Sequence, residues 1–318
     1  MKYIIVLGVL LLLGFVFWRA ISRDDRRMKR KQLAYQQMQA QIPVAAKDSF
    51  LRDREEGLYD KIYFGYYPQS GITDRDLIGK LNSLAGGKSN WKEDPEFHFL
   101  YQDVSYNNET YRGIHVIDRE NNWFLYEPIM WRVVSQANNV ATIYSCKALD
   151  LCQYSKSGDN NYAKSDLRAW LNGTFLETAF NKKQKEMIQV TSVDNSARST
   201  NPDNDPLKFN FGENPYACEN TQDKLFVVSV KEASIWNKAE EGFSRDLWYG
   251  RQSERSSYCD FKSRYYEKHE NMSVFNEWTR SPNWQSDKEV CAVYGPTIAG
   301  YVYQYGDVVP VLRLKLNG

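Results

Sequence analysis

Histidine is scarce in this 318-residue sequence, which contains only His98, His115 and His269. A histidine-based metal site or catalytic triad is therefore not expected. The sequence also lacks a glycine-rich phosphate loop, a set of residues spaced as metal ligands, and a serine–histidine–aspartate order with supporting motifs. These absences leave no catalytic constellation, so the sequence alone does not establish a reaction.

Excess charge of either sign is missing as well. Lysine and arginine total 41, aspartate and glutamate total 40, and the formal net charge is +1. A balance this close to zero gives no global electrostatic argument for nucleic acid or for an acidic substrate. We therefore expect no nucleic-acid partner.

Cysteine is present in an odd number, which cannot pair completely within one chain. Five residues separate Cys146 from Cys152, a longer gap than a zinc knuckle uses. Three interpretations stay open: buried small hydrophobic side chains, one or two disulfides, or a reactive thiol. The five are Cys146, Cys152, Cys218, Cys259 and Cys291.

One long apolar run is present, at residues 3–18 (YIIVLGVLLLLGFVFW). With Ala20 and Ile21 it approaches the roughly 20 residues that span a bilayer. Only Lys2 precedes the run, and WRAISRDD follows it, whereas a cleaved signal peptide has a basic start and a small-residue cleavage site. Residues 1–21 are therefore predicted to be an uncleaved, single-pass transmembrane anchor.

A basic stalk and linker is predicted at residues 22–59. Arginine and lysine cluster immediately after the apolar run, between residues 19 and 31. By the positive-inside rule, this cluster favours a cytoplasmic location for the rest of the chain. An extracytoplasmic location is the alternative.

The remaining residues, 60–318, are rich in aromatic side chains, including 22 tyrosines and 9 tryptophans. This composition favours many short strands and aromatic loops over a helical bundle. Residues 128–135 and 139–145 are predicted to form a hairpin, residues 224–230 a buried strand, and residues 273–316 a terminal run of strands. Helices are predicted at residues 74–84, 165–188 and 231–237, whereas residues 242–273 show little periodicity. The order of elements indicates an α+β fold.

The segment SDLRAWLNGTFLETAF, residues 165–180, carries the clearest helix signal. Ser165 or Asp166 can cap its first turn, and Leu167, Trp170 and Leu171 form one apolar stripe. Asn172-Gly173 is expected to end this first helix. Trp170 is predicted to pack in the core and Arg168 to pair with a nearby carboxylate.

Seven segments in this order resemble a bacterial family, the domain of unknown function 6273: IYFGYYPQS, PIMWRVVS, CKALDLCQY, SDLRAWLNGTFLETAF, ENTQDKLFVVSV, WTRSP and VVPVLRLKL. The resemblance spans about residues 60–318. It implies the C-type-lectin-like fold of formylglycine-generating enzymes, with a mixed twisted sheet, two or three helices and long loops that form a ligand surface. The family implies no general activity, and its members are often exported, which conflicts with the charge pattern after the anchor.

A ligand surface is predicted from side chains near the end of the chain, where aromatic faces alternate with polar groups suited to a glycan or a peptide. Three of the tyrosines are expected to share one face of a strand, so packing in the core is the alternative. The candidates are Trp278, Arg280, Trp284, Tyr301, Tyr303 and Tyr305.

A weak calcium site is predicted at Glu219, Asn220 and Asp223, because Ca²⁺ prefers several oxygen ligands. The alternative is a turn in which these side chains cap backbone groups. Asp203, Asn204 and Asp205 form a second oxygen-rich cluster with the same alternative.

Together these features predict a membrane-anchored, non-catalytic binding or scaffold module with a protein or glycan partner. The first alternative is a structural subunit of a larger cell-envelope assembly. A second alternative, implied by the resemblance to the oxidases, is a cysteine-dependent enzyme that uses Cys259 and Cys291, although their sequence contexts do not match that chemistry.

Overall fold

The computed structural model describes residues 51–53, 61–94, 96–117, 119–200, 214–236, 253–270, 273–293 and 295–316. The predicted anchor at residues 1–21 and most of the predicted stalk and linker at 22–59 lie outside these residues, and so does the second oxygen-rich cluster at 203–205. Among the described residues, no helix has the length and apolar character needed to cross a bilayer. Residues 49–318 form one unit by their contacts.

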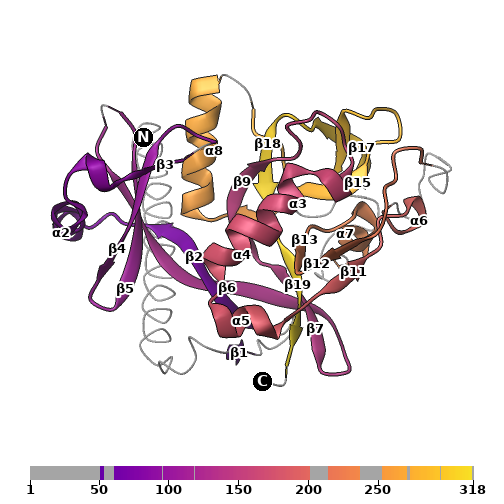
Figure 1. Ribbon diagram of the computed structural model, residues 1–318, viewed down its shortest axis with the longest axis horizontal. Helices are drawn as coiled ribbons and strands as arrows, with labels where there is room; N and C mark the ends of the chain where they lie inside the picture. Colours follow the sequence, from indigo (N-terminus) through magenta and orange to yellow (C-terminus); the bar gives the residue numbers. More distant parts are fainter. Residues whose placement is uncertain are drawn as a thin grey trace, which may run out of the picture. The chain divides into compact units, whose positions relative to one another are not determined.

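Strand β6 (Asn122–Ala137) is the long central strand of a ten-stranded sheet (Figure 1). Strand β2 (Lys61–Gly71) runs along one edge of β6, and β5 (Glu109–His115) and β7 (Val140–Ser145) share the other edge. Beyond β5 lie β4 (Leu100–Tyr106) and β3 (Lys92–Glu93), and beyond β7 lie β19 (Val311–Lys315) and β10 (Ile188–Gln189). β1 (Leu51–Asp53) pairs with β2, and β13 (Leu225–Phe226) pairs with β19.

Every pairing in this sheet is antiparallel. The expectation of a mixed sheet was therefore wrong for the main sheet. Among the described residues, parallel pairing is limited to β8 (Lys147–Ala148) with β14 (Glu254–Arg255), which form a separate small sheet, and to one isolated bridge between Phe275 and Gly306. The fold is therefore α+β with a mostly antiparallel sheet. Hairpins and other short connections join neighbouring strands in antiparallel pairs.

Smaller sheets complete the β structure and carry most of the C-terminal segments. β15 (Trp278–Pro282), β16 (Glu289–Ala292) and β17 (Gly295–Tyr301) form one, and β18 (Tyr305–Val308) pairs with β9 (Asp150–Gln153) to form another. β11 (Thr191–Val193) pairs with β12 (Thr221–Asp223). Residues 224–230, predicted to be a single buried strand, contain only the two-residue β13 before α7 begins.

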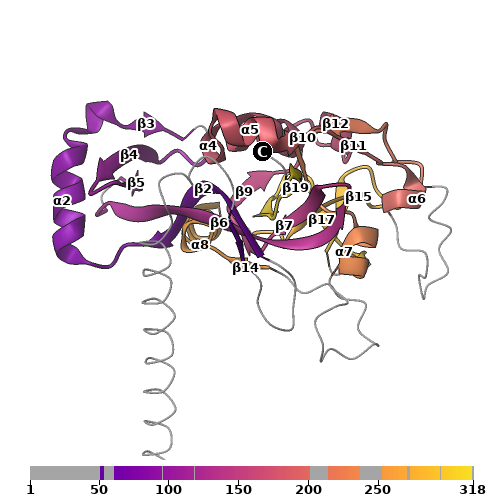
Figure 2. The ribbon, with the colours of Figure 1, turned by 90° about the horizontal axis from the view of Figure 1, so that it is seen from below.

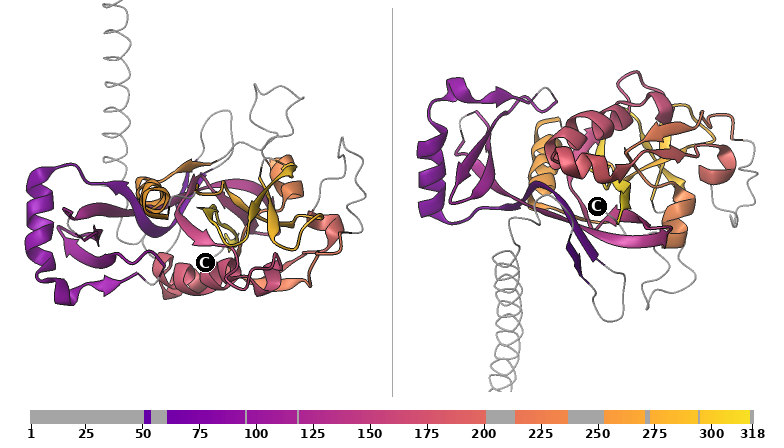
Figure 3. Two further views of the ribbon diagram at one scale, coloured as in Figure 1. Left: turned by 90° about the horizontal axis from the view of Figure 1, so that it is seen from above. Right: turned by 60° about the horizontal axis from the view of Figure 1, so that its bottom comes forward.

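The helices are short, and they are more numerous than the two or three expected. α2 (Arg75–Ala85) begins at Asp74, whose side chain accepts hydrogen bonds from the first-turn amides. It lies beside β4 at one end of the sheet, apart from α3 (Asp166–Trp170), α4 (Leu176–Ala179) and α5 (Lys182–Met187) (Figures 2 and 3). α6 (Ala197–Thr200) and α7 (Val230–Trp236) follow.

The segment at residues 165–180 differs from the prediction at Asn172-Gly173. Ser165 does cap α3, with its hydroxyl accepting from the Arg168 amide at 3.1 Å. The chain then continues through a π-helical turn, η4 (Leu171–Phe175), into α4. Asn172 does not end the helix. Its side chain donates to the Leu225 carbonyl at 2.8 Å and accepts from the Lys224 amide at 2.9 Å.

Helix α8 (Ser257–Glu270) lies in the region that showed little periodicity. Its buried face includes Lys262 and Ser263 beside Tyr258 and Cys259, so the core-facing stripe is partly polar. Apolar periodicity identifies a helix only when the buried face is apolar. α8 packs against β2 and β9.

Candidate functional site

Trp278 lies in the core. Its indole is fully buried and donates to the Cys152 carbonyl at 2.8 Å. The ring centroid lies 4.6 Å from that of Phe275. On the neighbouring strand, a Cβ added to Gly306 would lie 2.6 Å from the indole. These contacts give Trp278 a packing role in this structure.

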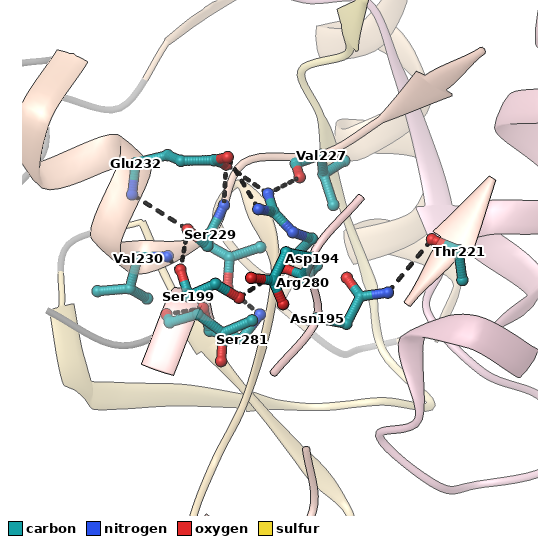
Figure 4. Close-up of polar contacts among 12 residues, drawn as sticks. Asp194, Asn195, Ser199, Thr221, Val227, Ser229, Val230, Glu232, Arg280 and Ser281 are labelled. Atoms are coloured by element: carbon teal, nitrogen blue, oxygen red, sulfur yellow. Dashed lines mark hydrogen bonds and ion pairs between the residues drawn. The ribbon is translucent and has the colours of Figure 1, made fainter. Parts of the chain in front are cut away.

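Arg280 is buried as well, and its guanidinium joins β15 to the start of α7 (Figure 4). It forms two hydrogen bonds with the Glu232 carboxylate, one of them at 2.8 Å, and donates to the Val227 carbonyl at 2.9 Å. Glu232 in turn accepts from the Ser229 amide at 2.9 Å, and the Ser229 hydroxyl accepts from the Glu232 amide at 3.1 Å. This reciprocal arrangement is a capping box, so Arg280 braces a helix start from within the protein.

Serine side chains extend this buried network. The Val230 amide donates to the Ser281 hydroxyl at 3.0 Å, and the Ser229 hydroxyl donates to the Ser199 carbonyl at 3.2 Å. Figure 4 shows these groups gathered around the Arg280–Glu232 pair. The Ser-x-x-Glu pattern at residues 229–232 is the sequence signal that could have identified the capping box. The Arg280 partner, 48 residues away, has no local signal.

Tyr305 is 9% exposed and points inward. Its hydroxyl donates to the Glu96 carboxylate at 2.9 Å, and its ring packs against Phe97 and Tyr266. Trp284 is half-buried in the turn after β15. Of the six predicted ligand-surface residues, Trp278, Arg280 and Tyr305 therefore pack inside the protein in this structure, as the alternative to a ligand surface expected.

Tyr301 and Tyr303 remain on the surface, with 46% and 49% of their area exposed. Their rings are stacked, with centroids 5.3 Å apart and planes 14° apart. They do not share a strand face with Tyr305, because β17 ends at Tyr301 and a turn closed by the Gln304 amide and the Tyr301 carbonyl (2.9 Å) precedes β18. We call Tyr301 and Tyr303 the tyrosine pair.

The turn that carries the tyrosine pair is held from both sides. Val302, between the two tyrosines, is fully buried. Its amide donates to the Lys288 carbonyl at 2.9 Å, and its carbonyl accepts from the Ser155 amide at 3.0 Å. The Gln153 side chain donates to the Tyr303 carbonyl at 2.7 Å. Sequence reasoning missed Gln153 and Ser155 because they lie about 150 positions earlier in the chain.

Two of the three predicted calcium ligands, Asp223 and Asn220, already accept hydrogen bonds with their side chains within the protein. Asp223 is buried, pairs with Arg168 at 2.7 Å and accepts from the Thr221 hydroxyl at 2.6 Å. Glu219 and Asn220 are exposed, and the Asn220 side chain accepts from the Asn195 amide at 3.0 Å. Among the described residues, no group of three or more histidine, cysteine, aspartate or glutamate side chains is arranged to hold a metal ion. The pairing of Arg168 with a carboxylate is confirmed.

None of the five cysteines, all of which the structure describes, forms a disulfide. Cys259 and Cys291, the candidates for oxidase-like chemistry, are both buried. Burial raises the pKa of Cys291 to about 12 and, with the nearby Asp307 charge, moves the pKa of Cys259 well above its ordinary value. Both groups are therefore neutral thiols at physiological pH, whereas a nucleophilic cysteine needs a lowered pKa.

A second buried ion pair, between Lys262 on α8 and Asp150 on β9, was not anticipated. The ammonium lies 2.5 Å from one oxygen of Asp150, and the Tyr67 hydroxyl donates to the other at 2.5 Å. Lys262 also lies over the Phe97 ring at 4.3 Å. These contacts join α8, β9 and β2 in the core, where the charges are compensated.

Comparison with known families gives one match. The profile described as "Domain of unknown function (DUF6273)" matches residues 120–316, more than half of the chain. The match begins at residue 120, whereas the resemblance in the sequence extends to residue 60. No significant similarity to a curated protein or to a solved structure was found. The match over most of the described domain shows that the chain belongs to the DUF6273 family.

Proposed function

We propose that this chain is a single-pass, membrane-anchored binding module with a C-type-lectin-like domain, and that the tyrosine pair contacts its partner. The observation that carries the proposal is the exposure of two stacked rings on a turn that is otherwise tied into the core. Residues 1–21 would hold the module at the membrane. Exposed aromatic side chains are common in recognition sites, because they offer a large contact area for few rotatable bonds.

The hydrogen bonds that hold the turn carrying the tyrosine pair favour binding of a partner without a change in the turn's conformation. Val302 anchors the backbone between the two rings, and Gln153 holds the carbonyl of the second tyrosine. A contact surface ordered before binding loses less conformational entropy when a partner arrives. The tyrosine pair therefore meets the requirement for a preformed site.

The small area of the tyrosine pair favours a glycan over a protein as its partner. The other large, exposed apolar side chains among the described residues are scattered singly: Leu84, Ile117, Val190 and Ile235. A stable protein interface buries on the order of 1,200 Å² or more, which one pair of rings does not supply. A sugar ring needs only one or two aromatic faces and neighbouring hydrogen-bonding groups, and Gln153 and Gln304 lie at the same turn.

The test is a glycan array probed with the full-length protein in detergent, followed by titration of any ligand found. Tyr303→Ala should weaken binding at least about tenfold, because removing an aromatic hot spot costs about 2 kcal/mol or more. Ile117→Ala removes an exposed apolar side chain from the turn that follows β5 and should leave binding unchanged. Thermal unfolding checks that both variants are folded.

Two results would contradict the proposal. Tyr303→Ala could bind the glycan as tightly as the unchanged protein, which removes the tyrosine pair from the site. Alternatively, the full-length protein could bind no glycan and co-purify with a stoichiometric protein partner, as expected for a subunit of an envelope assembly.

A further inference from the structure

A polar depression lies on the solvent-facing side of the main sheet, where β10, β19, β7 and β6 run side by side. Its volume is about 340 Å³. It is formed by side chains of these four strands and of the β6–β7 turn. Cavities of this size lie at the small end of the range that binds small molecules, so the depression suits a ligand the size of one sugar or amino acid.

Four polar side chains form a row across its floor. Strand register places Gln189 opposite Arg313, Arg313 opposite Thr142, and Thr142 opposite Ser135. The residues that alternate with them, Ile188, Leu314 and Ile143 among others, are buried on the opposite face. Because successive strand residues point to opposite faces, the row Gln189–Arg313–Thr142–Ser135 shares the outer face of the sheet, where Thr142 is the least accessible of the four at 8% exposure.

Arg313 is the only charged residue among those lining the depression. Its side chain is exposed, and its guanidinium forms no hydrogen bond or ion pair with any other described residue. Lys315, two positions later on the same strand, is exposed on the same side. The lining therefore presents positive charge without an acidic partner, which favours an anionic ligand.

The remaining groups narrow the class of anion. A guanidinium matches a carboxylate with two parallel hydrogen bonds. Thr142 and Ser135 supply hydroxyls, and Gln189 supplies an amide, so each can both donate and accept. Such groups suit a ligand that carries hydroxyls beside its carboxylate.

From these features we infer that the depression binds a hydroxylated carboxylate, such as a sugar acid. The ligand is either a free sugar acid or a uronic-acid unit within a glycan, which share this chemistry. Phosphate is disfavoured, because its sites usually combine several charged donors or a helix N-terminus, and this lining has one guanidinium on strands. The site is separate from the tyrosine pair and does not depend on it.

Saturation-transfer NMR with the full-length protein in detergent tests the inference. The probes are galacturonate, its neutral counterpart galactose, inorganic phosphate, and a short galacturonate oligomer. Galacturonate should bind at least about tenfold more tightly than galactose, since the two differ by the carboxylate that pairs with Arg313. Tighter binding of the oligomer identifies the glycan source, and equal affinity per unit identifies the free acid.

Variants locate the site. Arg313→Gln should reduce galacturonate binding about tenfold or more, and Arg313→Lys should reduce it less, because the charge remains but the bidentate geometry is lost. Arg75→Gln, the same change at an exposed arginine on α2, should leave binding unchanged, and so should Tyr303→Ala. Equal binding of galactose and galacturonate, stronger binding of phosphate, or retention of binding in Arg313→Gln would each overturn the inference.

Discussion

Glu277 is a carboxyl group with no exposed surface, located just before β15. It contacts the Tyr144 hydroxyl, and the Ser253 amide donates to it at 3.4 Å. Burial raises the pKa of Glu277 to about 8, and this effect outweighs the Ser253 hydrogen bond and the Arg132 charge, which lower it. The protein therefore holds a protonated carboxylic acid in its core at neutral pH.

This arrangement predicts a pH dependence of stability. The unfolded chain releases the Glu277 proton near its ordinary pKa of 4.5, whereas the folded protein retains it up to about pH 8. The stability that the retained proton contributes is therefore complete below pH 4.5 and is lost as the pH rises to about 8. Urea unfolding at pH 5.5 and pH 8.5 should show a smaller loss of stability in Glu277→Gln, which is neutral throughout, than in the unchanged protein. An equal loss in both proteins would contradict the assignment of this proton to Glu277.

At the scale of elements, a second and smaller hydrophobic core forms where strand β5 lies very close to two tryptophan side chains. Trp91 and Trp123 pack with Leu81 of α2 and Tyr111 of β5. Gly113 of β5 makes this packing possible, because a Cβ at that position would lie 2.8 Å from both tryptophan rings. A side chain there would have to displace two large rings.

Two glycines on neighbouring elements should respond in opposite directions. Gly113→Ala should lower the free energy of unfolding by about 1–3 kcal/mol through overpacking against the tryptophans. Gly79→Ala should raise it by about 0.5–1 kcal/mol, because Gly79 lies within α2 and no atom lies within 4 Å of its added Cβ. Chemical denaturation of the two variants measures both values. Equal effects of the two substitutions would show that the tryptophan contacts do not constrain Gly113.

At the scale of the whole molecule, the family match is shorter than the unit that packs together. The match begins at residue 120, yet β2, at residues 61–71, pairs with β6 at eight positions. β2 also places Ile62, Phe64 and Tyr67 in the main core. The segment before the family match is therefore part of the sheet.

A shortened chain tests this conclusion. A protein starting at Glu120 should fail to unfold cooperatively, because it loses β2 and leaves a long edge of β6 unpaired, which also promotes aggregation. A protein starting at Ser49 should unfold cooperatively. Thermal unfolding followed by near-ultraviolet circular dichroism compares the two. A sharp transition for the chain that starts at Glu120 would instead make residues 61–119 an independent addition.

Local patterns in the sequence determined the α+β class, the hairpin of β6 and β7, the helix near residues 74–84, the cap at Ser165, and membership of the DUF6273 family. Each of these features is recorded in short stretches of sequence, where residues a few positions apart form a periodic pattern, a cap or a motif. Only the tertiary structure decided that α8 forms and that Asn172 bridges to β13 within a continuous helix. It also decided that Arg280 and Tyr305 are buried. Tyr301 and Tyr303, in contrast, stay exposed. Each of these depends on a partner some 50 to 210 positions away, such as Glu232 for Arg280 or Glu96 for Tyr305. A buried polar group becomes stable only where such a partner compensates the loss of water, and composition and periodicity do not record which residues meet.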